Sequence, residues 1–210
     1  MKYSHLVFDI DGTLLDTEKA SLYSLRDVVF DMLQLDMSIR DLRFSLGITS
    51  DDALHTLGIA DVTYGNSLWQ VFYQKYAGHV RIFDGIPEIL RHLSRQTNTL
   101  GIITSKTKAE YQNDFVPFGL AQYFSIVVCA SDTRKHKPDS EPMVKFLEWS
   151  KADSGSVLYI GDTIHDMNCA KGANADFALA LWGCENPKEI RADHYLSSPY
   201  DIAGLLQSSK

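Results

Sequence analysis

The strongest constraint on the fold of this chain is a series of short apolar segments that alternate with amphipathic ones. The apolar segments cover residues 5–8, 100–103, 126–129, 157–160 and 177–181. None shows the two-residue alternation of a strand with one face in water, so both faces of each strand should be buried. The amphipathic segments between them include residues 87–95, 141–150 and 165–172. This alternation predicts an α/β fold in which helices cover both faces of a parallel sheet.

Residues 17–83 interrupt this alternation. They contain apolar patterns with helical spacing at 17–33, 39–46, 51–57 and 67–80, and no segment in them predicts a strand. We therefore predict a helical insertion after the first strand. The remaining residues, 1–16 and 84–210, would form the α/β domain.

Composition narrows the classes of partner. The chain has 210 residues, of which 45% are hydrophobic, enough for one core with a small accessory domain. Its net charge of -7 and the lack of a Lys or Arg run argue against binding to nucleic acid or to an anionic membrane. The apolar stretch near the N-terminus is too short for a signal peptide or a spanning helix. We expect a cytoplasmic protein, either a monomer or a weak homodimer.

The cysteines give no sign of a disulfide framework or of a zinc site. Cys129, Cys169 and Cys184 are odd in number and lack C-x-x-C spacing. Buried, reduced thiols are the expected state of all three.

Polar residues follow the predicted strands at the points where they end, and open parallel sheets bind ligands at that edge. The residues that follow these ends are Asp9, Asp11, Thr104, Ser105, Asp162 and Asp166, and Lys137 lies between the third and fourth strands, just ahead of the predicted helix at Glu141. Each alone could be a helix cap or a solvated surface charge. Their coincidence at one edge of the sheet indicates a functional site.

Asp9 and Asp11 are two residues apart, a spacing that on a strand points both carboxylates to one face. Two carboxylates about 4 Å apart repel by roughly 4 kcal/mol at a surface-like dielectric. Four carboxylates with few cationic side chains nearby require a hard divalent cation, and Mg²⁺ suits such oxygen ligands better than Zn²⁺. With that cation, one carboxylate could attack phosphorus while another serves as acid and base. We therefore predict a Mg²⁺-dependent phosphoryl-transfer site.

The motifs, taken in order, resemble the haloacid dehalogenase superfamily, in the subfamily I branch with a helical cap after the first motif. The segments that carry the resemblance are D-I-D-G-T-L-L-D-T, I-I-T-S-K-T, K-H-K-P-D-S-E-P and G-D-T-I-H-D-M-N. It extends over residues 3–205 and implies a Rossmann-like core, with residues 17–83 as the cap. It also implies a reaction through an aspartyl-phosphate.

The resemblance assigns catalytic and substrate-binding roles. Asp9 would be the nucleophile and Asp11 the general acid and base. Thr104, followed by Ser105, would bind the phosphoryl oxygens. Lys137 would stabilise charge on the transferring group.

The resemblance also assigns the metal ligands. Asp9 and Asp162 would bind Mg²⁺ through their carboxylates, and Asp11 through its backbone carbonyl. Asp166 would support the metal or its waters and pair with Lys137. Whether Asp166 binds the metal directly or through water stays open.

Several activities are compatible with these motifs. A phosphatase for a small phosphorylated metabolite, similar to phosphoglycolate phosphatases, is the first hypothesis. Inorganic pyrophosphatase or nucleotidase activity is an alternative, as is a non-catalytic sensor of a phosphorylated metabolite, although no catalytic residue is missing. A β-phosphoglucomutase-like transferase is disfavoured because Ser21, Leu46 and Ser50 stand where that subgroup has cationic or imidazole contacts to the substrate.

The cap should select the substrate. Residues 46–50 are neutral or small and should form a loop that faces the site. The aromatic residues at helical spacing, Trp69, Phe72, Tyr73 and Tyr76, should form the core of the cap. Lys106 could be a solvated side chain or a phosphate contact.

Overall fold

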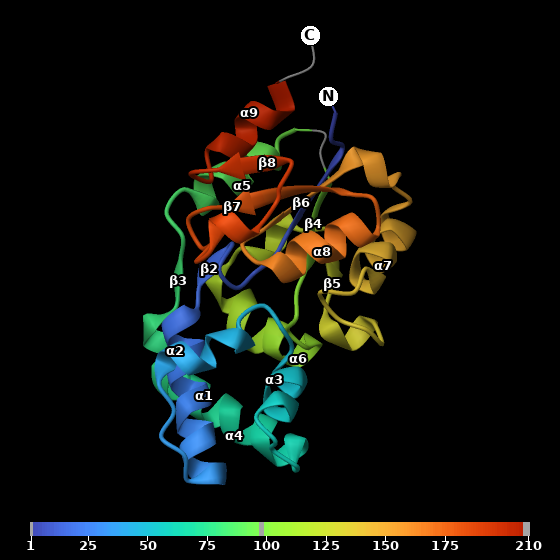
Figure 1. Ribbon diagram of the computed structural model, residues 1–210. Coiled ribbons are helices and arrows are strands. Elements are labelled where there is room, and N and C mark those ends of the chain that lie inside the picture. The colour runs from blue at the N-terminus through green and yellow to red at the C-terminus, as the bar shows by residue number, and fades with distance from the viewer. Residues whose placement is uncertain (1, 97–98, 208–210) are drawn as a thin grey trace.

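The computed structural model describes residues 2–96 and 99–207, and its main sheet confirms the predicted α/β fold. In the described part of the chain this sheet has six parallel strands in the order β5-β4-β1-β6-β7-β8. The strands are β1 (His5–Phe8), β4 (Thr99–Ile103), β5 (Ile126–Val128), β6 (Val157–Gly161), β7 (Asp176–Ala180) and β8 (His194–Leu196). Because β1 lies between β4 and β6, the ends of these three strands meet at one edge of the sheet (Figure 1).

Helices cover both faces of this sheet, as predicted. Leu6 and Phe8 of β1 pack in one apolar layer with the helices of residues 86–93 and 201–207, whereas Val7 packs in the opposite layer with the helices of residues 141–150 and 164–172. The helices of this part are α5 (Ile86–Leu93), α6 (Lys108–Glu110), α7 (Glu141–Ser150), α8 (Ile164–Gly172) and α9 (Asp201–Gln207). Burial on both faces explains why the strands show no alternation in the sequence.

Residues between β2 (Leu15–Asp16) and β3 (Arg81–Ile82) form the helical insertion that the sequence predicts. Its helices are α1 (Glu18–Leu33), α2 (Ile39–Leu42), α3 (Ser50–Thr56) and α4 (Val62–Tyr76). They enclose an apolar cluster of their own, built around Leu25, Val28 and Leu54. In Figure 1 these helices lie beyond the edge of the main sheet at which the ends of β1, β4 and β6 meet. Every helix in residues 2–96 and 99–207 is too short or too polar to cross a membrane.

A small antiparallel ribbon joins the two parts, and the sequence analysis missed it. Strand β2 (Leu15–Asp16) pairs with β3 (Arg81–Ile82), so the chain enters and leaves the insertion along adjacent segments. An ion pair of 3.3 Å between Arg81 and Asp16 lies across the ribbon. The expectation that residues 17–83 contain no strand is wrong because two-residue strands are too short to produce an apolar pattern. The three residues of β8 were missed for the same reason.

Candidate active site

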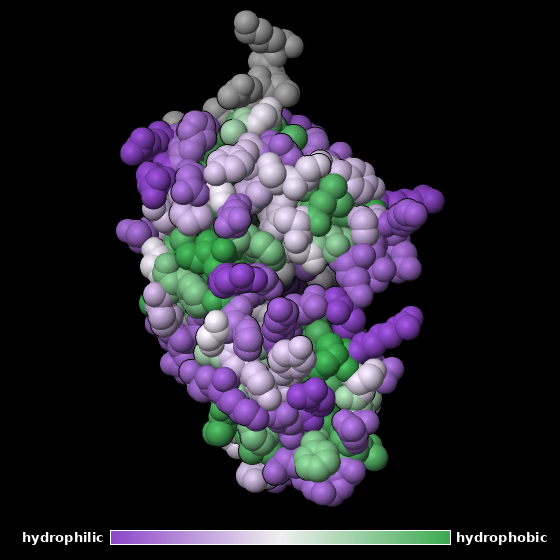
Figure 2. Space-filling model, turned by 90° about the vertical axis from the view of Figure 1, so that its left-hand side faces the viewer, coloured by the Kyte–Doolittle hydropathy of each residue, from purple (hydrophilic) through white to green (hydrophobic). Residues whose placement is uncertain are grey.

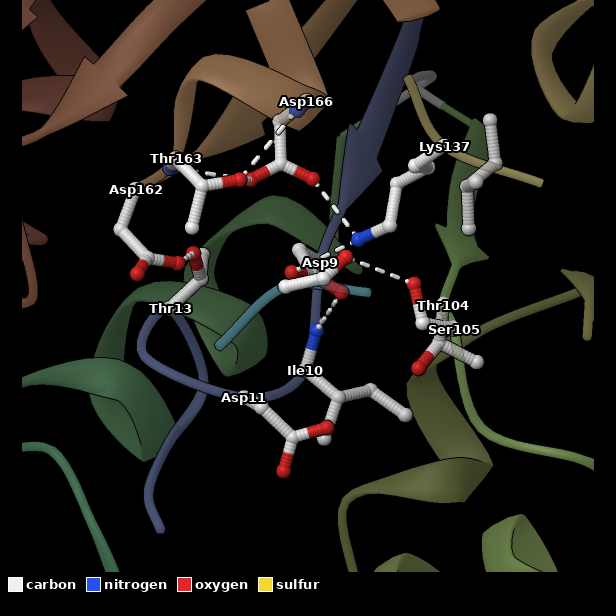
Figure 3. A network of polar contacts seen from close by, with 12 residues as sticks. Asp9, Ile10, Asp11, Thr13, Thr104, Ser105, Lys137, Asp162, Thr163 and Asp166 are labelled. Carbon is white, nitrogen blue, oxygen red and sulfur yellow. Dashed lines mark hydrogen bonds and ion pairs between the residues drawn. The ribbon is translucent and has the colours of Figure 1, made fainter. Parts of the chain in front are cut away.

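Asp9 lies at the centre of the site, immediately after β1. Its backbone N–H donates a hydrogen bond of 2.9 Å to the carbonyl of Ile160 in β6, which fixes its place at the sheet edge. The side chain is 2% exposed, and its Oδ2 lies 2.9 Å from Lys137 Nζ (Figure 3). Burial raises the pKa of Asp9 to about 7, although the Lys137 ammonium acts in the opposite direction. Asp9 is therefore a buried carboxylate whose charge is only partly compensated.

Lys137 bridges Asp9 and Asp166. Its Nζ lies 2.8 Å from Asp166 Oδ1, which also accepts a hydrogen bond of 2.9 Å from the Tyr159 hydroxyl. The other oxygen of Asp166 accepts bonds from the backbone N–H and the hydroxyl of Thr163, at 3.0 and 2.6 Å. Burial alone would raise the pKa of Asp166, but Lys137 and Thr163 hold it below its ordinary value. Asp166 is thus an ionised anchor that holds Lys137 against Asp9.

The loop that carries Lys137 is fixed by carboxylates at its ends. The backbone N–H groups of Arg134 and Lys135 donate to the Glu141 carboxylate at 2.9 and 3.0 Å. Asp139 accepts a bond of 2.9 Å from the N–H of Glu141, at the start of α7. These contacts position the backbone on both sides of Lys137.

Asp162 follows β6 and faces the loop after β1. Its Oδ1 accepts a hydrogen bond of 2.7 Å from the Thr13 hydroxyl. Gly12 has a φ of +80°, and a Cβ there would lie 2.2 Å from Asp162 Oδ2, so only glycine fits this turn. Burial, together with the charges of Asp166 and Asp9, raises the pKa of Asp162 well above its ordinary value. Across residues 2–96 and 99–207, no cationic side chain forms an ion pair with Asp162.

The residues of this cluster fit a hard divalent cation. One carboxylate oxygen from each of Asp9, Asp162 and Asp166 lies within 4.8 Å of the others, and all three side chains are buried. Such a set of oxygen donors suits Mg²⁺. Because each oxygen of Asp166 already accepts two hydrogen bonds, Asp9 and Asp162 have more capacity for a metal than Asp166 has.

Asp11 does not share a face with Asp9, and that prediction is wrong. Strand β1 ends at Phe8, so strand alternation does not extend to Asp11, whose carboxylate points away from Asp9 (Figure 3). Its Oδ1 lies 3.1 Å from the Nζ of Lys106, a side chain that is 12% exposed.

In the part of the chain that the structure describes, the cationic partners in the cluster are few, as expected. Two lysines, Lys106 and Lys137, lie among the four carboxylates of Asp9, Asp11, Asp162 and Asp166. With all six groups ionised, four negative and two positive charges leave a net charge of two negative. One divalent cation would neutralise it.

Thr104 and Ser105 lie at the end of β4, but they face different partners. Thr104 is 4% exposed, and its side chain points toward Asp9 (Figure 3). The Ser105 hydroxyl instead donates a hydrogen bond of 2.8 Å to the carbonyl of Gly47 in the helical insertion. Thr104 is therefore directed at the site centre, whereas Ser105 joins the two parts of the molecule.

A cavity of about 100 Å³ lies between the α/β part and the helical insertion. Asp9, Asp11 and Lys137 line it from one side, and residues 46–48 and 50 from the other, so the prediction that this loop faces the site is confirmed. Gly47 has a φ of +84°, and a Cβ there would lie 3.0 Å from the Thr163 side chain, so glycine allows the close approach. Figure 2 shows an indentation between the two parts, bordered largely by hydrophilic side chains.

Several residues that shape the site were not identified from the sequence. Tyr159 lies inside an apolar strand and Thr163 resembles an ordinary helix cap, so neither suggests a contact with Asp166. Lys106 was left open as a solvated side chain or a phosphate contact, and the sequence did not suggest its ion pair with Asp11. Tyr73 was assigned to the core of the insertion, but it lines the cavity.

Comparison with known proteins identifies the family. The model of the haloacid dehalogenase-like hydrolases matches residues 6–180. The chain belongs to this family. It is therefore a hydrolase of the family that its motifs resemble, and the resemblance is confirmed.

The relatives cover nearly the whole chain. A Caldanaerobacter subterraneus protein provisionally named pyrophosphatase PpaX is 22% identical, with 99% of this chain and 96% of that protein covered. The N-acetylmuramic acid 6-phosphate phosphatase of Pseudomonas putida is 23% identical, with 100% and 98% covered. A solved Lactobacillus plantarum structure, provisionally named phosphoglycolate phosphatase, has a TM-score of 0.88 and 27% identity, with 98% and 100% covered.

Proposed function

We propose that this hydrolase is a cytoplasmic, Mg²⁺-dependent phosphatase that cleaves a small phosphomonoester through an aspartyl-phosphate on Asp9. The observation that carries the proposal is the buried contact of Asp9 with Lys137, inside a cluster of side chains whose net charge is two negative when all are ionised. The phosphatase names of several relatives support the same reaction class.

Asp9 and Asp162 would hold the metal through their carboxylates, and Asp11 through its backbone carbonyl. When bound, Mg²⁺ supplies positive charge that lets an anionic phosphoryl group approach these carboxylates. Asp166 would hold Lys137 against Asp9 and would support the metal indirectly, because its oxygens are already hydrogen-bonded.

In the first step, a carboxylate oxygen of Asp9 attacks phosphorus, and the bond between phosphorus and the leaving oxygen breaks. Lys137 and Thr104 stabilise the phosphoryl oxygens in this step. The Asp11 carboxyl donates its proton to the leaving oxygen, so the product leaves as an alcohol.

In the second step, water attacks the aspartyl-phosphate and releases inorganic phosphate. The Asp11 carboxylate accepts the proton of this water and is ready to act as an acid again. Asp9 returns to its free carboxylate form. The net reaction consumes one water and one phosphomonoester and gives one alcohol and one phosphate.

Residues 17–83 would act as a cap domain on a core domain of residues 1–16 and 84–210. The cap must exclude water in the first step and admit it in the second. The ribbon of β2 and β3 is the connection across which such a movement would occur. The hydrogen bond from Ser105 to Gly47 would hold the closed position.

Turnover of activated phosphates tests the proposal without knowledge of the natural substrate. The wild-type protein should hydrolyse acetyl phosphate and p-nitrophenyl phosphate in Mg²⁺ and lose this activity in excess chelator. Asp9→Asn should be inactive under both conditions. Full activity of the wild type in chelator would contradict the metal dependence, and activity of Asp9→Asn would contradict the nucleophile.

A further inference from the structure

Part of the cavity wall should determine which leaving group the site accepts. Side chains from α4 and from the segment after β4 contribute to the cavity wall, and Lys106 among them contacts both Asp11 and the ring of Tyr73. We call this set the leaving-group pocket. Its members are Asn66, Gln70, Tyr73, Lys106, Glu110 and Asp114. Because Asp9 and Lys137 line the same cavity, a substrate whose phosphorus reaches Asp9 would extend its remaining atoms into this pocket.

The charge balance of the pocket opposes a second anionic group on the substrate. Lys106 is its cation among the described residues, and it is already paired with Asp11 at 3.1 Å. Glu110 and Asp114 add two carboxylates to the wall. Three carboxylates against one ammonium leave the wall negative, even if burial, which raises the pKa of Asp114 to about 6, neutralises part of its charge. A substrate carboxylate or second phosphate would meet net repulsion there.

The pocket also contains buried polar atoms without hydrogen-bond partners among the described residues. They are the hydroxyl oxygen of Tyr73 and the Oδ1 of Asn66. The amide orientation of Asn66 is fixed because its Nδ2 donates a hydrogen bond of 2.5 Å to Asp51. A buried polar atom without a partner costs free energy, so these positions favour a ligand that forms hydrogen bonds.

The chemistry of these atoms indicates the kind of ligand. Asn66 Oδ1 is an acceptor, and the ionised carboxylates of Glu110 and Asp114 are acceptors only. The Tyr73 hydroxyl can accept or donate. The wall thus offers acceptors at Asn66, Glu110 and Asp114 and donors at Lys106 and Gln70. Hydroxyl groups of a ligand both donate and accept, so they match this mixture. Lys106 Nζ lies over the ring of Tyr73, 5.6 Å from its centroid, so the two side chains form one part of the wall.

We propose that the leaving group is uncharged and rich in hydroxyl groups, as in a polyol or sugar monophosphate, and carries no second anionic group. This inference rests on the proposed phosphatase function and specifies its substrate class. It separates this protein from an enzyme for phosphoglycolate or pyrophosphate, whose leaving groups are negatively charged.

Pairs of substrates that differ in one terminal group, a CH2OH group in place of a carboxylate, test the inference. In Mg²⁺, kcat/KM should be at least about tenfold higher for glycerol 3-phosphate than for 3-phosphoglycerate. The same order should hold for 2-hydroxyethyl phosphate over phosphoglycolate. Equal values, or a preference for the anionic member or for pyrophosphate, would overturn the inference while leaving the phosphatase function intact. Lack of turnover of every substrate, acetyl phosphate included, would instead overturn the proposed function and this inference with it.

Asp114→Asn tests whether the pocket causes the preference. Loss of this carboxylate should lower the ratio of kcat/KM for glycerol 3-phosphate to kcat/KM for 3-phosphoglycerate by about threefold or more. Asp31→Asn, at an exposed position of α1, is the matched control for the same change in net charge. Equal effects of the two variants would contradict the role of the pocket.

Tyr73→Phe tests the hydrogen-bonding role. The ratio of kcat/KM for glycerol 3-phosphate to that for acetyl phosphate should fall about fivefold, because acetyl phosphate has no hydroxyl group to bind. Tyr64→Phe, at an exposed position of the same helix, should leave the ratio unchanged. A ratio that Tyr73→Phe does not change would overturn the assignment of Tyr73, provided that both variants melt within a few degrees of the wild type.

Discussion

Lys106 Nζ lies 3.1 Å from Asp11 Oδ1, on the side of the site that faces the helical insertion. The ion pair directs the Asp11 carboxylate toward the leaving-group pocket and away from Asp9 (Figure 3). This orientation suits a residue that exchanges protons with the leaving oxygen and with water, while Asp9 forms the bond to phosphorus.

Asp11→Asn should therefore slow substrates according to their leaving group. Loss of general acid and base catalysis costs about 10²- to 10⁴-fold, and an alkyl phosphate needs the proton more than an aryl phosphate does. Single-turnover rates of the phosphoryl-transfer step for glycerol 3-phosphate and p-nitrophenyl phosphate measure the difference. An equal loss for both substrates would rule out Asp11 as the general acid.

Asp162→Asn should remove most of the stabilisation by Mg²⁺. At a metal concentration of about 100 times Kd, binding to the folded state adds about 2.7 kcal/mol to the free energy of unfolding. Thermal melts in Mg²⁺ and in chelator give this difference for the wild type and for the variant. In chelator, the variant should melt no lower than the wild type, because it loses a buried carboxylate that has no ion-pair partner in the described residues. An undiminished Mg²⁺ effect in the variant would exclude Asp162 as a ligand.

The stability of the metal-free protein should depend on pH through Asp9. Burial raises the pKa of Asp9 from the ordinary value of 3.8 to about 7, so the folded state binds this proton more tightly than the unfolded state does. The contribution to stability is complete below pH 3.8 and is lost as the pH rises to about 7. Mg²⁺ needs the ionised carboxylates, so its effect on the melting temperature should grow between pH 5 and pH 8. A Mg²⁺ effect that is constant over this range would contradict the assignment.

Tyr159→Phe should destabilise the site although the residue touches no substrate. The change removes the hydroxyl that donates to Asp166 and that also lies within hydrogen-bond distance of the Ile103 carbonyl. We expect a loss of about 1–3 kcal/mol in the free energy of unfolding. Denaturant unfolding measures it, with Tyr200→Phe at an exposed position as the control. Equal stability of the two variants would mean that the Tyr159 hydroxyl does not support Asp166.

The sequence predicts the features that follow from continuously apolar segments and from the order of those segments along the chain. The strands around Val7 and Tyr159 are recognisable because burial on both faces makes them continuously apolar. Asp9, Thr104 and Asp162 directly follow strands, so the sequence predicts that they meet at one edge of the sheet. Lys137 is farther from a strand end and lies in the K-H-K-P segment that carries the family resemblance.

Local geometry is the part that the sequence did not predict. The direction of Asp11 depends on where β1 ends and on Lys106, more than 90 residues away in the chain. Asp166 has no free acceptor position partly because the Tyr159 hydroxyl donates to it. In the sequence, Tyr159 cannot be distinguished from a tyrosine that only fills the core. Such contacts are set by side-chain orientation, which spacing does not encode.

Trapping the phosphorylated protein tests the central claim most directly. Asp11→Asn should slow the second step, so a brief incubation with Mg²⁺ and ³²P-labelled acetyl phosphate should leave phosphate on the protein. The account predicts an acid-stable, hydroxylamine-labile label in the peptide that contains Asp9, and none in the Asp9→Asn/Asp11→Asn double variant. A label on another residue, or turnover of substrate with no label in the peptide that contains Asp9 at any time point, would contradict the aspartyl-phosphate mechanism.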